Sequence, residues 1–486
     1  MPHLIPQESI VMTQVASNSA LPSLDGLRAS FRGELIDTGH PAYEQTRRSL
    51  LFNGMHDRRP ALIARCSYAG DVQAALSYAR AQNLVVAVRG GGHSTPGYSS
   101  CDDGVVIDTS PIKTVDVDTA QREGRFGAGL TWAELDAATQ ADGLAVTGGR
   151  VSHTGIAGFT LGSGSGWLER NYGMTAASLL AAQVVTADGQ LVNASADENP
   201  DLLWGLRGGA GNFGVVTEFR FRLHPVGPLV FAGLILHPRE SASAFIRFYR
   251  EFMRDAPDDV GGAVGLMTAP PAEFIPEAAR GQQVCGVLVF YTGDLQQGPT
   301  AFGPVLEWGK PLMSQVGPMP YTAVQSLLDG SFPWGIKDYG KVDYVRDLSD
   351  QAVDTMVQLA WQATSPFSVV LLCPLGGAVS RMDRFSMALN VPNTDWMYFC
   401  EATSWDDQQQ AADIAWAKNF LATMRPWSVD QAPPNFLEPD EGTRRIRASF
   451  GEEKFQRLTA LKDRYDPTNV FSRNVNIRPS GARART

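Results

Sequence analysis

Cysteine is scarce in this chain and its cysteines are not arranged in pairs. The 486 residues include five, Cys66, Cys101, Cys285, Cys373 and Cys400, with no Cys-x-x-Cys spacing. An odd number at wide intervals is typical of buried, reduced thiols rather than of a disulfide framework or a zinc site. The seven histidines show no metal-binding spacing either. We therefore expect no metal centre and a reducing, cytoplasmic location.

The chain also lacks an excess of positive charge and any long hydrophobic run. Its 41 Lys and Arg residues are outnumbered by 51 Asp and Glu residues, which gives a net charge of -10. This balance argues against a surface for nucleic acid or for an anionic membrane. No apolar run approaches membrane-spanning length, and Met1 to Leu24 has no hydrophobic signal-peptide core. The length and the 44% hydrophobic content predict a globular protein of two or three domains.

Glycine, by contrast, is abundant and is concentrated in three blocks. The first block, Arg89 to Tyr98, follows an apolar run over residues 84–88 that predicts a buried strand. Its three consecutive glycines remove every Cβ where the backbone must come close to something, and bare N–H groups can form a nest for a phosphate. His93 is the first polar side chain after them. The alternative is a surface turn with an incidental histidine.

The second block runs from Thr147 to Gly158 and continues to Gly166. It follows a predicted helix over residues 131–143, whose start carries a capping box formed by Thr131 and Glu134. Glycines this dense indicate backbone that lies against a ligand or against another backbone. The apolar residues interleaved with them favour burial over a mobile surface loop.

The third block, Arg207 to Gly214, contains Gly-x-Gly-x-x-Gly and raises the possibility of a Rossmann dinucleotide site. That motif needs a strand before it and a helix after it. Here a predicted helix precedes the glycines, and residues 215–223 follow as an alternating strand. The Rossmann interpretation therefore fails.

Beyond Pro225 the glycine blocks stop and amphipathic helices alternate with strands. Strands are predicted near residues 284–291, 368–372 and 396–403, and helices near 350–363 and 406–424. This pattern favours an α+β domain whose antiparallel sheet is covered by helices, beginning near residue 228. The aromatic residues of the predicted helices are expected to form core.

In combination, the glycine blocks and the C-terminal segment resemble one family. The stretches RGGGHS, SHTGIAG and GGAGNFGVVTEF, and the terminal pattern Tyr-Asp-Pro-x-Asn-x-Phe-x-x-Asn-x-Asn-Ile, resemble the berberine-bridge-enzyme-like flavoproteins of the vanillyl-alcohol-oxidase superfamily, over residues 59–479. The resemblance implies an α+β fold with a two-part, PCMH-type FAD-binding domain and a substrate domain built on an antiparallel sheet. The expected divisions are residues 1–227 (core from about 59), 228–440, and a segment 441–486 that returns to the FAD domain.

The resemblance also implies which residues hold the cofactor. His93 would be joined covalently to the 8-methyl carbon of FAD. The other residues implied to surround the cofactor are Arg89, Gly90, Gly91, Gly92, Ser94 and Gly97 of the first block, Thr147, Gly148, Val151, Ser152, Gly155 and Gly158 of the second, Asn212, Gly214 and Val216 of the third, and Asn474 and Asn476 of the terminal segment.

Two departures from the family pattern affect the expected chemistry. Many relatives carry a second tether, a cysteine, at the position of Val151, so a single linkage through His93 is expected here. Relatives often carry a tyrosine base in a Tyr-x-Asn motif before the last helix, but the matching segment in this chain is Pro433-Pro434-Asn435. The usual mechanism for a secondary alcohol, which needs a partner to take the hydroxyl proton, is therefore not expected, and another base could come from the substrate domain.

The candidate replacements lie in the substrate domain. On the strand 396–403, Glu401 shares a face with Phe399, and Tyr398 shares the other face with Cys400. Only one of these faces can be directed at the flavin, and the sequence leaves open which one. Lys337 and Tyr339 are further candidates. For each, a solvated or packing role is the alternative.

We expect a flavin-dependent oxidase that takes a hydride from an amine, an alcohol or a natural-product intermediate of secondary metabolism and passes the electrons to oxygen, giving hydrogen peroxide. The missing tyrosine favours an amine or a natural-product tailoring substrate. The alternatives are a dehydrogenase that uses another acceptor, a flavin-bearing cyclase with no net redox change, and a cofactor-free binding protein. Its partners would be a small-molecule substrate and molecular oxygen.

Overall fold

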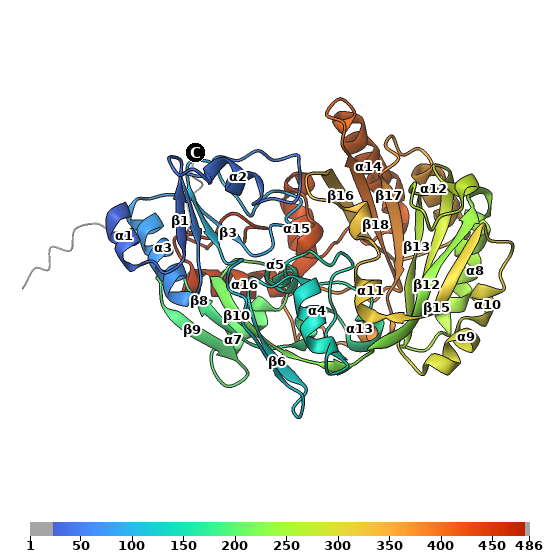
Figure 1. Cartoon of the computed structure of the whole chain (residues 1–486), viewed down its shortest axis with the longest axis horizontal. Helices are drawn as coiled ribbons and strands as arrows, with labels where there is room; N and C mark the ends of the chain where they lie inside the picture. The colour runs from blue at the N-terminus through green and yellow to red at the C-terminus, as the bar shows by residue number, and fades with distance from the viewer. Residues whose placement is uncertain (1–22, 482–486) are drawn as a thin grey trace, which may run out of the picture.

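In the computed structural model, which describes residues 23–481, the chain forms four sheets arranged in two halves (Figure 1). The N-terminal segment that was expected to have no signal-peptide core lies largely in residues 1–22, outside the described part of the chain. Residues 482–486 of the tail also lie outside the described part. None of the described helices is long and apolar enough to cross a membrane.

The first half contains three of these sheets, all from the N-terminal part of the chain. A four-stranded sheet has the order β1 (Glu34–Asp37), β2 (Leu62–Arg65), β4 (Val105–Asp108), β3 (Val86–Arg89). A five-stranded antiparallel sheet has the order β5 (Val115–Asp118), β6 (Glu123–Gly127), β10 (Val215–Arg222), β8 (Leu179–Val185), β9 (Leu191–Ser195). A short pair joins β7 (Leu144–Ala145) to β11 (His224–Pro225). The first glycine block begins at the end of β3, so the place of this strand in the sheet fixes where the block lies.

Short helices connect these strands and confirm two sequence predictions. They are α1 (Leu24–Ser30), α2 (Tyr43–Arg48), α3 (Ala69–Ala81), α4 (Trp132–Gln140), α5 (Ile156–Leu161), α6 (Glu169–Tyr172) and α7 (Pro200–Leu206). The capping box of Thr131 and Glu134 starts α4 as predicted. Helix α7 precedes the third glycine block and β10 follows it, so the order is opposite to that of a Rossmann motif.

The second half is built on a seven-stranded antiparallel sheet. Its order is β15 (Met313–Pro320), β12 (Leu229–Pro238), β14 (Gln283–Tyr291), β13 (Val260–Thr268), β17 (Val369–Pro374), β18 (Trp396–Ser404), β16 (Lys337–Val345). Helices α8 (Ala242–Arg254), α12 (Asp350–Ala360) and α14 (Gln410–Met424) share one hydrophobic cluster with residues from one face of this sheet. Smaller helices complete this half: α9 (Gly298–Ala301), α10 (Gly303–Leu306), α11 (Tyr321–Gln325) and α13 (Gly377–Arg381). The other face of the sheet is directed at the first half.

The C-terminal helices α15 (Gly442–Phe450) and α16 (Glu452–Tyr465) lie between the two halves (Figure 1). Helix α16 reaches the first half, where the buried ammonium group of Lys462 donates to the carbonyls of Asn212 and Phe471, each at 2.9 Å. It also pairs with Asp466 at 2.7 Å. The terminal segment is thereby tied to the third glycine block.

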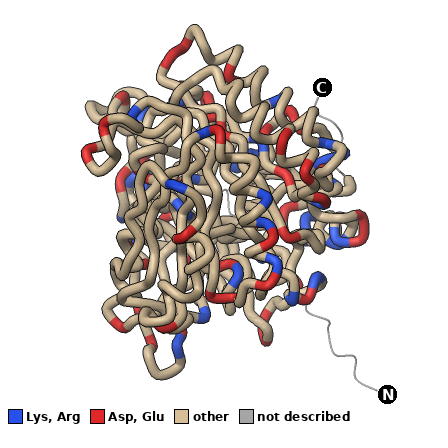
Figure 2. The backbone as a smooth tube through the Cα atoms, turned by 90° about the vertical axis from the view of Figure 1, so that its right-hand side faces the viewer, with Lys and Arg blue, Asp and Glu red and all other residues tan. Residues whose placement is uncertain are grey.

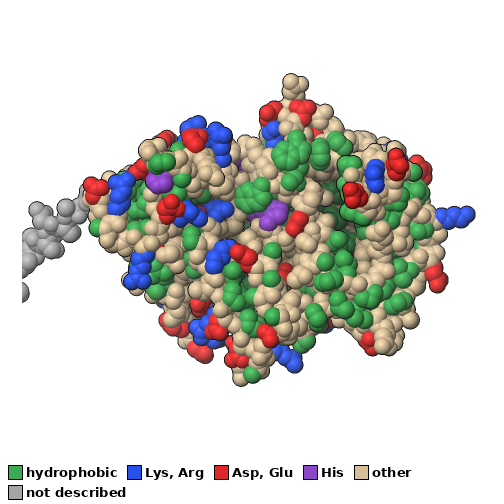
Figure 3. Space-filling model, in the orientation of Figure 1, with side chains coloured by type: hydrophobic (Ala, Val, Ile, Leu, Met, Phe, Trp, Pro, Cys, Tyr) green, Lys and Arg blue, Asp and Glu red, His purple; other side chains and the backbone are tan. Residues whose placement is uncertain are grey.

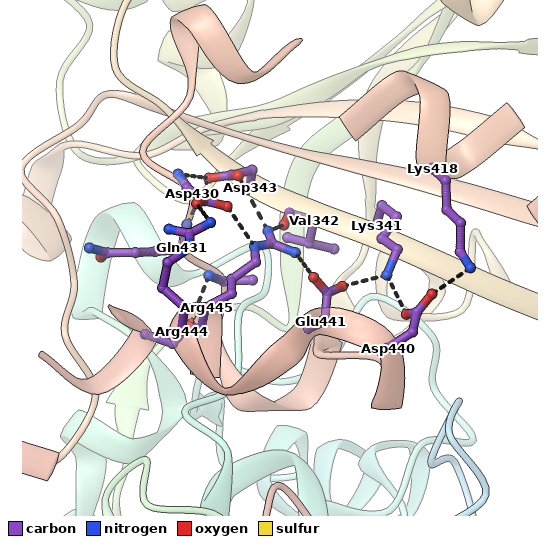
Figure 4. A network of polar contacts seen from close by, with 12 residues as sticks. Lys341, Val342, Asp343, Lys418, Asp430, Gln431, Asp440, Glu441, Arg444 and Arg445 are labelled. Atoms are coloured by element: carbon purple, nitrogen blue, oxygen red, sulfur yellow. Dashed lines mark hydrogen bonds and ion pairs between the residues drawn. The ribbon is translucent and has the colours of Figure 1, made fainter. Parts of the chain in front are cut away.

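Helix α15 binds the second half instead, so the segment 441–486 does not return to the FAD domain alone. Arg445 pairs with Asp343 of β16 at 3.3 Å and with Glu441, while Lys341 of β16 donates to Glu441 at 2.6 Å (Figure 4). These buried charges satisfy one another, as charges removed from water must. Elsewhere, basic and acidic residues are interspersed along the chain (Figure 2).

Candidate functional site

A cavity of about 780 Å³ lies between the two halves of the molecule. All three glycine blocks and the C-terminal segment form one wall, and the helix-free face of the seven-stranded sheet forms the other. A volume of this size is typical of a small-molecule or cofactor site.

The cavity collects most of the residues that the resemblance assigned to the cofactor. Those that line it are Gly90, Gly91, Gly92, His93, Ser94, Val151, Gly155, Gly158, Gly214, Val216 and Asn474. Their roles toward FAD remain predictions. These residues come from four separate stretches of the chain, and only the tertiary structure brings them together.

The remaining assigned residues do not line this cavity, and their roles toward FAD also remain predictions. They are Arg89, Gly97, Thr147, Gly148, Ser152, Asn212 and Asn476. Arg89 turns away to pair with Asp108 at 3.0 Å, and the Thr147 hydroxyl donates to the Gly173 carbonyl. Asn212 holds the C-terminal segment, since its amide donates to the Val475 carbonyl and accepts from the Ile477 N–H. Polar groups engaged in this way support the wall from behind.

The glycines of the wall have two different reasons to be glycine. The backbones of Gly91 and Gly155 approach so closely that a Cβ on either would overlap the other. These two glycines therefore join the first block to the second. A Cβ at Gly158 or Gly211 would meet open space, because both face the cavity. These positions leave room for a bound group.

This wall fits FAD. Open space at Gly158 and Gly211 allows a flat ring and a diphosphate to approach the main chain, and Gly90, Gly91 and Gly92 also line the cavity. The buried Oδ1 of Asn474 has no partner among the described residues, while its Nδ2 donates to the Gly211 carbonyl at 2.8 Å. An orphaned amide oxygen beside a cavity indicates a ligand that completes its hydrogen bonding.

His93 projects from the first block into a cluster of rings. Its ring stacks on Phe52 with centroids 4.0 Å apart, and its Nε2 lies 3.1 Å from Nδ1 of His153. Trp334 closes the cluster edge-on. Burial, followed by the nearby His153, lowers the pKa of His93 to about 3, so the imidazole is neutral at physiological pH. A neutral imidazole retains the lone pair that a nucleophile needs.

The second glycine block offers no cysteine near this histidine. Val151, the position at which the resemblance implies a cysteine in relatives, lines the cavity. The nearest candidate in sequence, Cys101, is buried behind the wall with its thiol directed at the Val85 carbonyl. All five cysteines are buried and free.

The register of β18 decides between the two candidate faces. Glu401 and Phe399 line the cavity, whereas Tyr398 packs against Phe420 of α14 on the helix-covered face and is fully buried there. The candidate role of Tyr398 as a catalytic residue is therefore wrong. Successive side chains of a strand point to opposite faces, so one register admits only one of the two.

Lys337 is also in the wrong place for catalysis. It lies at the start of β16, where its ammonium group pairs with Asp407 at 2.5 Å and donates to the Trp405 carbonyl. Tyr339 donates its hydroxyl to Asp440 at 2.8 Å. Neither residue lines the cavity. Neither side chain is therefore positioned to act on a substrate bound in the cavity.

Two carboxyl groups that the sequence did not single out join Glu401. Asp338 of β16 and Glu438, which follows the Pro433-Pro434-Asn435 segment, both line the cavity and are buried. The Oδ1 atom of Asp338 has no partner among the described residues. Gly340, directly opposite Glu401 across the strand pair, leaves the space that the Glu401 carboxyl fills. We call Asp338, Glu401 and Glu438 the carboxyl cluster.

Each member of the carboxyl cluster is harder to ionise than a free carboxyl. Burial raises the pKa of Asp338 to about 7. Burial, then the charges of Asp338 and Glu438, raise the pKa of Glu401 well above its usual range. Burial and Asp338 raise the pKa of Glu438 to about 8, although Lys341 opposes this. The cluster therefore holds protons near neutral pH and is poised to exchange them.

The basic side chains at the cavity are engaged elsewhere. Among the described lining residues these are Arg150 and Arg473. Arg150 pairs with the buried Glu169 at 2.6 Å, and Arg473 donates to the Ser100 carbonyl at 3.0 Å. The sheet side of the cavity thus presents carboxyl groups and apolar surface. The described His, Cys, Asp and Glu residues form no group arranged to hold a metal ion.

These features are those of an FAD-linked oxidoreductase, and comparison with known proteins agrees. An FAD binding domain matches residues 60–195, and a berberine and berberine-like segment matches residues 434–478. The (R)-6-hydroxynicotine oxidase of Paenarthrobacter nicotinovorans is 37% identical over 468 residues, which is 93% of this chain and 98% of that protein. An FAD-linked oxidoreductase of Dictyostelium discoideum is 28% identical over 425 residues, covering 86% and 89%.

The fold of this chain is also similar to that of a solved structure. The solved structure of the berberine-bridge-enzyme-like protein 1 of Physcomitrella patens superposes with a TM-score of 0.84 at 22% identity, covering 95% of this chain and 100% of that one. The chain belongs to the berberine-bridge-enzyme-like family of FAD-linked oxidoreductases. Its cofactor is FAD.

Proposed function

We propose that this protein is an oxidase of a small amine, with FAD attached through His93 alone and dioxygen as the electron acceptor. The observation that carries the proposal is the carboxyl cluster on the sheet side of the cavity. A protonated amine entering there would meet carboxyl groups that lack a basic partner within the cavity. The similarity to an enzyme named for oxidation of 6-hydroxynicotine, an amine, supports the same class. We also propose a cytoplasmic location, which the free thiols support.

Glu401 is the residue we assign as proton acceptor. It stands on the cavity face of β18 and is positioned by Gly340 across the strand pair. Removing a hydride from a carbon next to nitrogen requires the nitrogen lone pair, so an ammonium group must first lose a proton. The ionised form of Glu401 accepts that proton readily, because burial and the two neighbouring carboxyl groups raise its pKa.

Asp338 and Glu438 would hold the substrate cation against the sheet. Their charges raise the pKa of Glu401, and a bound cation would offset that repulsion. Apolar residues of the same face, including Leu288, Leu371 and Phe399, would contact the carbon skeleton. When bound, FAD supplies the hydride acceptor.

Anaerobic mixing with matched amine and alcohol substrates tests the proposal. We expect amines to bleach the visible absorbance of the flavin faster than alcohols of the same shape, and peroxide to form when air is admitted. Faster bleaching by the alcohols would contradict the amine class. Bleaching without peroxide formation in air would favour a dehydrogenase. No bleaching with any substrate, together with a product of unchanged mass, would favour the cyclase.

The substitution Glu401→Gln tests the proton acceptor. The amide keeps the shape of the side chain but cannot take a proton, so the rate of anaerobic flavin reduction should fall at least about 100-fold. Glu307→Gln, an exposed change outside the cavity, is the matched control and should leave the rate unchanged. A rate within a factor of two of wild type in Glu401→Gln would assign the proton acceptor elsewhere.

A further inference from the structure

The geometry points to His153 as the residue that positions and deprotonates His93 for attachment to the flavin. This inference rests on the proposed covalent linkage and adds to it a second histidine. His153 belongs to the second glycine block, sixty positions along the chain from His93, and the sequence analysis did not single it out.

The contact between the two histidine rings sets the direction of proton transfer. Nδ1 of His153 faces Nε2 of His93 at 3.1 Å, and the backbone carbonyl of Phe332 raises the pKa of His153. For His153 to take the proton of His93, its Nδ1 must accept, so its own proton lies on Nε2. His93 then carries its proton on Nε2 and keeps the lone pair on Nδ1. In this arrangement the attacking atom of His93 is Nδ1.

A loop from the second half of the molecule holds this pair in place. The carboxylate of Asp329 accepts from the N–H of Ser152 at 2.7 Å and from its hydroxyl at 2.6 Å, immediately before His153. The negative charge of Asp329 also raises the pKa of His153, opposing the effect of burial. His153 is thus the member of the pair better able to carry a proton, because burial and His153 itself lower the pKa of His93 to about 3.

His153 also borders a second cavity that gives it a route to solvent. This cavity, of about 710 Å³, shares Gly90 and Gly91 with the first, and His153 and Trp334 line it. Hydrophobic side chains gather near the middle of the face of the molecule that Figure 3 shows. The charged residues around the second cavity pair with one another or with neighbours: Arg89 with Asp108, Arg65 with Glu34 and Lys113 with Glu134.

The contacts of His153 serve the step in which His93 becomes attached to FAD. A bond forms between Nδ1 of His93 and the 8-methyl carbon of FAD. The ring proton on Nε2 of His93 passes to Nδ1 of His153. The methyl carbon of FAD loses one hydrogen. The two electrons released pass by way of the flavin to dioxygen, which with two protons becomes hydrogen peroxide. His153 then returns to neutrality by releasing its proton into the second cavity.

Attachment rates in variants test this role without relying on turnover. Wild type, His153→Ala and His153→Gln are prepared with little flavin by restricting riboflavin during expression, and then incubated with FAD in air. Acid precipitation separates attached flavin in the pellet from released flavin in the supernatant, so binding and attachment are measured together. His224→Gln, on a histidine remote from both cavities, is the matched control.

We expect attachment in His153→Ala to be at least about 100-fold slower than in wild type, with FAD still bound and released by acid. His153→Gln should be intermediate, because its amide oxygen can accept the hydrogen bond from His93 but cannot take the proton. Added imidazole should restore attachment in His153→Ala, since the second cavity opens onto the vacated site, and should not change wild type. A purely structural role would not show this rescue.

Two outcomes would overturn these conclusions separately. Wild-type attachment rates in both His153 variants would show that the second histidine has no part in the step, while leaving the linkage through His93 intact. Acid-released flavin in wild type would show that the linkage itself is absent. If His153→Ala does not fold, His153→Gln decides the question by the same measurement.

Discussion

The two walls of the central cavity are built in opposite ways. The FAD-binding wall is made of bare backbone from glycine-rich loops, whereas the substrate wall is made of carboxyl and apolar side chains on a rigid sheet. Backbone N–H groups can hold a diphosphate without charged side chains, which suits a cofactor common to many relatives. Side chains on a sheet can be exchanged without moving the backbone, which suits a substrate that differs between relatives.

The glycine contact within the FAD-binding wall should give the largest effect. In Gly91→Ala, the new Cβ would overlap the backbone of Gly155, which cannot move aside. We expect a loss of about 3 kcal/mol of stability and little bound flavin. Melting temperature and flavin content measure the two effects.

Gly158→Ala is the companion variant for this comparison. Its Cβ enters the cavity without touching protein, so melting of the flavin-free protein should change by less than about 0.5 kcal/mol while flavin content falls. Equal destabilisation in both variants would contradict the distinction between glycines that join the blocks and glycines that face the ligand.

The substrate wall should respond through its pH dependence. In Asp338→Asn a negative neighbour is lost, and that neighbour raises the pKa of both Glu401 and Glu438. The pKa of Glu401 should therefore fall, so its deprotonated form appears at lower pH. The acid limb of the anaerobic reduction rate should move down by roughly one pH unit. A shift to higher pH, or an unchanged limb, would show that Asp338 does not act on the proton acceptor.

The smallest effect is expected on the covered face of the same sheet. Tyr398→Phe removes a hydroxyl that is buried without a hydrogen-bond partner among the described residues. Stability should stay within about 1 kcal/mol of wild type, and flavin reduction should be unchanged. A reduction rate lowered tenfold or more would mean that the two faces of β18 are not functionally separate.

Much of the FAD-binding half could be predicted from sequence because its signals are local. Consecutive glycines mark bare backbone, the capping box marked the start of α4, and the order of α7 and β10 around the third block ruled out a Rossmann motif. The resemblance of the ordered motifs to one family identified FAD. Local signals are less informative about side-chain direction: nothing in the glycine-rich pattern indicates that Arg89 pairs with Asp108 or that Asn212 donates to the Val475 carbonyl.

The sequence by itself determined the class of protein, the cofactor, and the alternation that placed Glu401 and Tyr398 on opposite faces of one strand. Only the tertiary structure decided which face meets the cavity, because that depends on which side of the sheet the distant helices α8, α12 and α14 cover. It alone joined Asp338 and Glu438 to Glu401, and His153 to His93. These groups lie far apart along the chain, and only the packing of the two halves brings them within reach of one another.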